Sequence, residues 1–184
     1  DVCHKYHMYL FVDGARMGYG LGAAENDLTL ADFGRLADVF YIGGTKCGAF
    51  FGEALVLTDA GIGRRFKAHM KQFGAVLAKG WLLGLQFYTL LHDGTYFAIT
   101  KRADEYAMQI REAFRQKGIP ELVVSPTNQQ FVILSQEQAR KLGEKYVFEA
   151  EGPVDDDHLC VRFCTSWSTK AEEVDQLVAD ILNL

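Results

Sequence analysis

Three short apolar runs in the first third of the chain predict the strands of one sheet. They cover residues 8–12, 39–42 and 54–58. The first two runs are continuous rather than alternating, which is typical of buried strands in a parallel or mixed sheet. The first run stops at Asp13 and the second at Gly43. Only a tight loop separates the second run from the third, so we expect these two strands to pair antiparallel.

Apolar residues at helical spacing predict the helices that connect and follow this sheet. A short helix is expected to begin at Asn26 or Thr29, where Thr29 can cap it, and to end at Ala37. Two further helical regions are expected: residues 62–92, interrupted near Gly74, Gly80 and Gly84, and residues 96–117, closed by Gly118 and Pro120.

The rest of the chain mixes strand-like runs with helical ones and predicts a smaller α+β lobe. The expected strands are residues 122–125, 130–134, 146–149 and 159–164. The expected helices are residues 135–144 and 170–184, the second capped by Ser168 or Thr169. The whole is therefore expected to be an α/β protein with a mixed sheet and a small α+β lobe.

Composition narrows the class of protein. The chain has 184 residues, is 49% hydrophobic, and carries a formal charge of −5 with a pI near 5.5. Lysine and arginine are scattered rather than clustered, which argues against nucleic acid as a partner. No apolar stretch has the length of a membrane span. Four cysteines without a CxxC pair favour reduced thiols, and hence a cytoplasmic protein.

Two chemically active side chains follow the first two predicted strands. Asp13 ends the first strand, and Lys46 comes shortly after the second. Ligands of open α/β sheets bind beyond the carboxyl ends of the strands, so one crevice is expected to contain both residues. For an arbitrary acid and lysine, a plain salt bridge is the alternative interpretation.

Four short motifs in this order resemble the fold-type I pyridoxal-phosphate (PLP) enzymes, and most closely the threonine aldolase and β-eliminating lyase family. They are Asp13-Gly14-Ala15-Arg16, Gly43-Gly44-Thr45-Lys46, Ser125-Pro126-Thr127-Asn128-Gln129 and Val161-Arg162-Phe163-Cys164-Thr165. The resemblance covers essentially the whole chain. It implies that residues 1–95 are the remainder of the PLP-binding large domain, and that residues 96–184 are the small C-terminal domain with its linking helix.

The resemblance also implies roles for individual residues. Lys46 would be the Schiff-base lysine, and Asp13 would hold the proton of the pyridine nitrogen while the ring takes up electrons. Arg16 would bond the phenolic oxygen of the cofactor or the substrate carboxylate, although it could instead brace Asp13. Thr45 would bind the phosphate, or simply a neighbouring backbone group.

Two more basic residues are carried over from the family. Arg162 would bind the substrate α-carboxylate through a two-pronged hydrogen bond. Its alternative is an ion pair with one of the three acids at 155–157, a run interpreted as a solvated turn. Lys79, placed on the long helical region, loosely matches a basic residue that the family has near the phosphate or the active-site mouth, and this role is left open.

Other patterns predict less. His4 and His7 share one helical face but have no further ligands nearby, so no metal site is expected. Cys47 is interpreted as a packing residue rather than a redox group. The glycine-rich stretch at 18–22 does not follow a strand with nucleotide-loop spacing, and we interpret it as an active-site loop or turn.

The predicted function is cleavage of β-hydroxy-α-amino acids such as threonine or allo-threonine to glycine and acetaldehyde. The family's phosphate-binding loop and ring-stacking residue are not found before Asp13, so the chain is expected to be an incomplete, C-terminal part that is inactive alone. The catalytic base would come from the missing segment or from water. The alternatives are a β-eliminating lyase of aromatic amino acids, an aminotransferase, or an inactive scaffold. The resemblance implies a homodimer or homotetramer.

Overall fold

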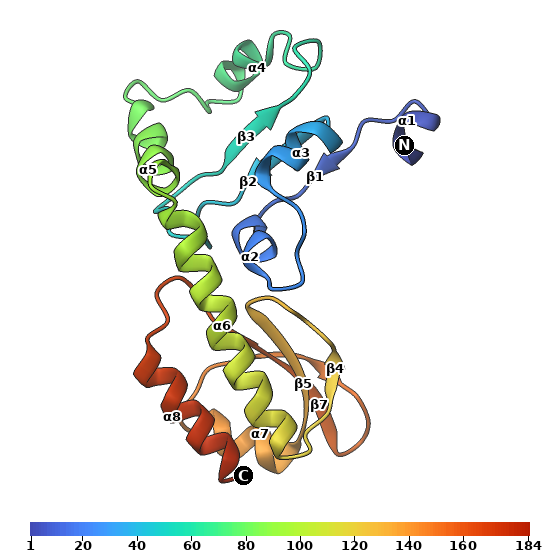
Figure 1. The fold of residues 1–184 in the computed structure, drawn as a ribbon, viewed down its shortest axis with the longest axis vertical. Helices are drawn as coiled ribbons and strands as arrows, with labels where there is room; N and C mark the ends of the chain where they lie inside the picture. Colours follow the sequence, from blue (N-terminus) through green and yellow to red (C-terminus); the bar gives the residue numbers. More distant parts are fainter. The chain divides into compact units, whose positions relative to one another are not determined.

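A computed structural model describes residues 1–184, which form two compact units (Figure 1). The first unit contains residues 1–21 and 26–98, and the second contains residues 22–25 and 99–184. The chain thus passes from one unit to the other inside a helix, α6 (Thr95–Gln116). As a division into domains, the expected boundary between residues 95 and 96 stays a prediction.

The first unit is built on a three-stranded mixed sheet. Its strands lie in the order β1 (Phe11–Val12), β2 (Val39–Ile42) and β3 (Ala54–Leu57). β1 pairs parallel with β2, and β2 pairs antiparallel with β3, as the sequence predicts. The central strand β2 is the most buried of the three because it has a neighbour on each side.

The first strand is shorter and more exposed than its apolar run suggests. The run at 8–12 was expected to be a strand buried on both faces, but only Phe11 and Val12 pair with β2. Phe11 keeps 56% of its surface exposed. The physical reason is that β1 is an edge strand, with no further strand beside it to cover its outer side.

Five helices precede, separate or follow the strands of this sheet along the chain. They are α1 (Val2–Lys5), α2 (Met17–Gly22), α3 (Leu30–Leu36), α4 (Phe66–Gln72) and α5 (Trp81–His92). Thr29 is the N-cap of α3 as expected, and its backbone N–H donates to the Asp32 carboxylate at 2.6 Å. The helical region at 62–92 does break between α4 and α5, where Gly74 adopts a φ of 73°. The interruption expected at Gly84 is wrong, since this residue lies inside α5.

The glycine-rich stretch at 18–22 also differs from its expected conformation. It forms most of α2 rather than a loop or turn. Tyr19 within it is fully buried. Burial of this aromatic side chain, together with Met17, offsets the low helix propensity of the surrounding glycines.

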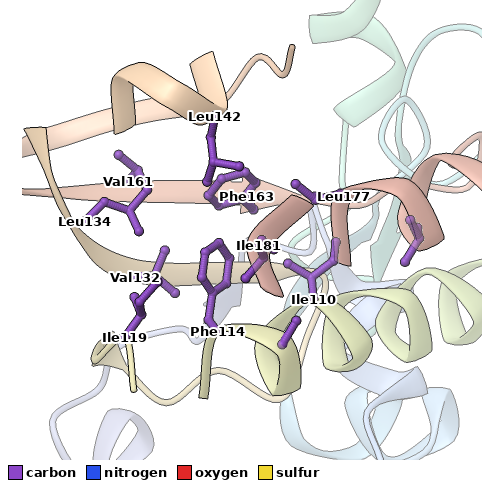
Figure 2. Close-up of a cluster of buried hydrophobic side chains, with 12 residues drawn as sticks. Ile110, Phe114, Ile119, Val132, Leu134, Leu142, Val161, Phe163, Leu177 and Ile181 are labelled. Atoms are coloured by element: carbon purple, nitrogen blue, oxygen red, sulfur yellow. The ribbon is translucent and has the colours of Figure 1, made fainter. Parts of the chain in front are cut away.

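The second unit packs helices on an antiparallel sheet. The strands lie in the order β4 (Glu121–Val123), β5 (Gln129–Ser135), β7 (His158–Cys164) and β6 (Glu149–Pro153). Its other helices are α7 (Gln136–Gly143) and α8 (Ala171–Leu182). Figure 2 shows apolar side chains of α6 and α8 pointing toward those of β5 and β7; Phe114 and Val132 are among the members that are fully buried.

One predicted strand of this unit is wrong. Residues 146–148 form no strand, and β6 begins only at Glu149. Tyr146 and Phe148 instead pack from a loop onto the apolar core, and the Tyr146 hydroxyl donates to Asp180 at 2.6 Å. The expected cap of α8 differs as well, because Lys170 and not Ser168 or Thr169 stands at its N-cap. No helix has the length and apolar character that crossing a membrane requires.

Candidate active site

The two residues singled out beyond the strand ends lie at the same edge of the first sheet. Asp13 directly follows β1, and Lys46 lies in the turn after β2. Because β1 and β2 run parallel, their carboxyl ends point the same way. The predicted proximity is therefore present, and the Lys46 ammonium contributes to lowering the pKa of Asp13.

Two glycines allow the segments after these strands to pack backbone against backbone. The Gly43 N–H donates to the Gly14 carbonyl at 2.9 Å. A Cβ on Gly43 would lie 2.3 Å from the carbonyl oxygen of Ala15, and one on Gly14 would lie 1.7 Å from that of Tyr41. Neither distance is possible for a side chain. The glycines of both motifs therefore hold the Asp13 and Lys46 segments together.

Asp13 has one oxygen held and one oxygen free. Its Oδ1 accepts hydrogen bonds from the Tyr41 hydroxyl and from the Ala15 N–H, the latter at 3.0 Å. The Tyr41 bond is the largest cause of a lowered Asp13 pKa, and the Ala15 bond follows. No hydrogen bond reaches Oδ2, and no ion pair joins Asp13 to Lys46. The salt-bridge alternative is therefore not what the structure contains.

Lys46 combines a fixed backbone with a free side chain. The hydroxyl of buried Tyr19 donates to the Lys46 carbonyl, and that of buried Tyr96 donates to the Gly43 carbonyl at 2.8 Å. Cys47, next in the chain, is fully buried, which raises the pKa of its thiol. The Lys46 side chain itself is exposed and makes no ion pair. The backbone of Lys46 is thus held in place, while its amine has no partner.

Glu53 is a site residue that the sequence analysis missed. Its carboxylate accepts hydrogen bonds from the Gly44 N–H and from the Thr45 hydroxyl, the latter at 3.2 Å. It therefore closes the loop that carries Lys46. The available signal was a single acid inside an otherwise apolar and glycine-rich stretch, 51–57. The Thr45 hydroxyl was expected to bind the phosphate or a backbone group. In the structure its partner is the Glu53 carboxylate.

The other basic residues expected near the cofactor are in the same unit. Arg16 precedes α2, is half-buried, and forms no ion pair, so it does not brace Asp13. Lys79 lies in the turn before α5 rather than on a helix, which corrects the expected position. Its side chain is exposed and also unpaired. Both cations are available to an anionic ligand.

Arg162 belongs to the second unit, on the central strand β7. Its register partners are Phe131 on β5 and Glu149 on β6. The Nε atom lies 3.2 Å from Glu151 Oε1, without the alignment of a hydrogen bond. The alternative pairing with acids 155–157 is wrong, because those residues form an exposed turn around His158. The two terminal nitrogens of Arg162 have no partner in the chain.

His4, one of the two histidines for which no metal site was expected, contacts a carboxylate. His4 Nε2 lies 3.1 Å from Asp38, whose carboxylate also accepts a bond from the Leu10 N–H at 2.7 Å. This contact ties α1 to the segment before β2.

The donor set at the sheet edge fits a pyridoxal phosphate. A free carboxylate oxygen with a lowered pKa suits a protonated pyridine nitrogen, and a free primary amine suits the aldehyde. Unpaired cations suit the phosphate.

Comparison with known proteins agrees with this chemistry. The solved structure of Leishmania major threonine aldolase is 37% identical in sequence and superposes with a TM-score of 0.95, over 98% of this chain and 53% of that one. A low specificity L-threonine aldolase of Pseudomonas aeruginosa is 28% identical over 97% of this chain and 51% of its own length. The chain thus spans about half the length of the relatives it matches.

A more distant neighbour marks the wider class. The lysine aminotransferase from Mycobacterium tuberculosis, solved in the internal aldimine form, superposes with a TM-score of 0.55 at 14% identity, which shows the fold alone. No family model matches the chain. The fold is that of a fold-type I PLP-dependent enzyme, and the donor set suits that class. Within it, the chain is a relative of the threonine aldolases, so the resemblance found in the sequence is confirmed.

Proposed function

We propose that the protein carrying this chain is a PLP-dependent threonine aldolase, which cleaves threonine or allo-threonine to glycine and acetaldehyde. The observation that carries the proposal is that Asp13 and Lys46 lie close together at the carboxyl ends of adjacent parallel strands. Similarity to threonine aldolases over nearly the whole chain supports the same substrate class.

Pyridoxal phosphate, when bound, supplies an aromatic ring that accepts the electrons of the breaking Cα–Cβ bond. The free Oδ2 of Asp13 would bind the N–H of that ring and keep the nitrogen protonated. Lys46 would anchor the cofactor through its Nζ atom and exchange protons there with the substrate amine. Its fixed backbone and unpaired amine suit both tasks.

The cations would orient the anionic groups. Arg16 would bond the phenolic oxygen of the cofactor or the substrate, while Thr45 and Lys79 would bind the phosphate. Arg162 would hold the substrate α-carboxylate through its two terminal nitrogens, which the chain leaves without partners. An acceptor for the proton of the substrate hydroxyl would be water or a group outside this chain.

The same residues could also support elimination from aromatic amino acids or transamination, because both reactions need a cofactor lysine, an acid at the ring nitrogen and a carboxylate clamp. Similarity to threonine aldolases favours the aldol cleavage. An inactive scaffold would retain the fold without reacting with the cofactor. The proposal further includes a homodimer or homotetramer, a cytoplasmic location, and activity that requires more than these residues.

The proposal is tested with the full-length protein, purified with PLP. Threonine should give equimolar glycine and acetaldehyde, measured by amino-acid analysis and by coupled reduction of the aldehyde. Borohydride reduction followed by peptide mass analysis should find the cofactor on Lys46. Lys46→Ala should lose both signals, while the control Lys67→Ala, an exposed lysine on α4, should keep them. A four-carbon keto acid as the product from threonine, or no adduct at all, would contradict the proposal.

A further inference from the structure

Tyr41 is the residue that fixes the orientation of the Asp13 carboxylate. It lies on β2, one strand over from the segment that follows β1. Its hydroxyl donates to Asp13 Oδ1, the same oxygen that accepts the Ala15 N–H at 3.0 Å. Both donors act on one oxygen, so the carboxylate cannot rotate without losing them, and Oδ2 is left open.

The phenol is itself held in place. Tyr41 pairs with Leu55 of β3 in the sheet register, and its ring lies 6.0 Å from that of Phe11 on β1, measured between centroids. The side chain is half-buried. Asp13, in contrast, is exposed and lies outside any helix or strand, directly after a two-residue strand. Packing therefore fixes the Tyr41 side chain, whereas the Asp13 side chain depends on its hydrogen bonds for a fixed orientation.

We propose that Tyr41 is a positioning residue for the PLP site: its hydroxyl holds Asp13 Oδ1 so that Oδ2 faces the N–H of the cofactor ring. This inference rests on the proposed function. A carboxylate that accepts two hydrogen bonds on one oxygen stays ionised and keeps a fixed direction for a third bond on the other. Without the phenol, Asp13 would keep only the local bond from Ala15 and would turn toward solvent.

The experiment compares Tyr41→Phe with the unaltered full-length protein in two binding titrations. One uses PLP, and the other uses its deaza analogue, in which a ring C–H replaces the pyridine nitrogen. The substitution keeps the aromatic ring and its contact with Phe11. Without the Tyr41 hydroxyl, the charged contact between Asp13 and the ring N–H should weaken. This should raise the Kd for PLP about tenfold. The Kd for the deaza analogue should stay unchanged, because it has no ring N–H for Asp13 to bind.

Tyr146→Phe is the matched control. Tyr146 also donates its hydroxyl to a carboxylate, that of Asp180 at 2.6 Å, but in the second unit. Its loss should leave both Kd values as they are. A Tyr41→Phe protein that binds PLP as tightly as the unaltered protein would overturn the inference. So would equal weakening toward both ligands, since that is the effect of a general structural defect.

The ratio of the two Kd values is measured on one and the same protein, so it separates positioning from partial misfolding. A double substitution adds a second comparison: with Asp13→Asn already present, Tyr41→Phe should weaken PLP binding no further. If the unaltered protein binds no PLP at all, the proposed function itself fails. If it binds PLP and Tyr41→Phe has no effect, only the role of Tyr41 fails.

Discussion

The carboxylate of Glu53 accepts a hydrogen bond from the Thr45 hydroxyl, 3.2 Å away, on the residue directly before Lys46. The other oxygen of the same carboxylate accepts from the Gly44 N–H. One acidic side chain thus connects the start of β3 to the turn after β2. The position of Lys46 depends on it as well as on the two buried tyrosines that bond the backbone of this turn.

Replacing Glu53 should loosen the Lys46 turn. In Glu53→Ala, the Gly44 N–H and the Thr45 hydroxyl lose their acceptor and turn to water. We expect a fall of a few degrees in Tm and a several-fold weaker PLP affinity in the full-length protein. Thermal melts and cofactor titrations measure the two effects. Glu149→Ala removes an exposed acid from β6 and should change neither quantity.

Gly43→Ala should damage the sheet edge far more. The added methyl would lie 2.3 Å from the Ala15 carbonyl and 2.5 Å from that of Gly14. The two segments must then separate, which we expect to cost about 2–3 kcal/mol of unfolding free energy and to abolish PLP binding. Urea unfolding and cofactor titration provide the measurements. A variant with unaltered stability would contradict the close packing of these two segments.

Gly34→Ala is a matched glycine substitution with the opposite expected sign. Gly34 lies inside α3, and a Cβ there would meet nothing within 4 Å. Alanine has the higher helix propensity, so we expect a gain of about 0.5–1 kcal/mol in unfolding free energy. PLP affinity should stay as it is, which the same titration checks.

The sequence predicts the part of the site that is local. Short stretches of neighbouring residues are enough to predict the apolar strands that end before Asp13 and Gly43. They are also enough to predict that the second and third strands pair antiparallel. The amino-acid pattern alone therefore assigns Asp13 and Lys46 to one edge of the sheet. The connection between β2 and β3, residues 43–53, is shorter than the crossover that parallel strands need, which leaves an antiparallel arrangement for these strands.

The parts that could not be predicted depend on register and on burial by distant residues. Tyr41 bonds Asp13 only because β1 and β2 pair as they do, and the two residues are 28 positions apart. The apolar run at 146–148 looks like a strand, but its aromatic side chains are buried from a loop. The strand beside β7 is instead the polar β6, because pairing with the open edge of β7 depends on backbone groups rather than on side-chain polarity.

Arg162→Lys should separate substrate binding from the chemical step. Lysine keeps the charge but lacks the planar fork that binds a carboxylate through two hydrogen bonds. We expect the KM for threonine to rise about tenfold with little change in kcat, provided that the arginine binds substrate and transition state equally. Steady-state kinetics of the full-length protein measure both. Arg140→Lys, at an arginine that also pairs with a glutamate but on α7, should leave the KM unchanged.

Asp104 should make the stability of the protein fall with rising pH. It lies on α6 in the second unit, is 4% exposed, and neither of its carboxylate oxygens has a well-aligned hydrogen-bond partner. Burial raises the pKa of Asp104 to about 8 from an ordinary value of 3.8; the Asn128 N–H opposes this rise only in part, and the charge of Glu105 adds to it. Below both values the acid is neutral in the folded and in the unfolded chain, and burial costs no charge.

Between these two pKa values the unfolded chain has released the proton while the folded chain still holds it. Unfolding therefore becomes easier as the pH rises from about 4 to about 8, and the effect is constant above that range. Asp104→Asn cannot lose a proton, so its urea midpoint relative to the unaltered protein should increase steadily across this window. Glu105→Gln replaces an exposed acid on the same helix. The difference between its urea midpoint and that of the unaltered protein should change much less with pH. A constant difference between Asp104→Asn and the unaltered protein at all pH values would mean that Asp104 is ionised in the folded state.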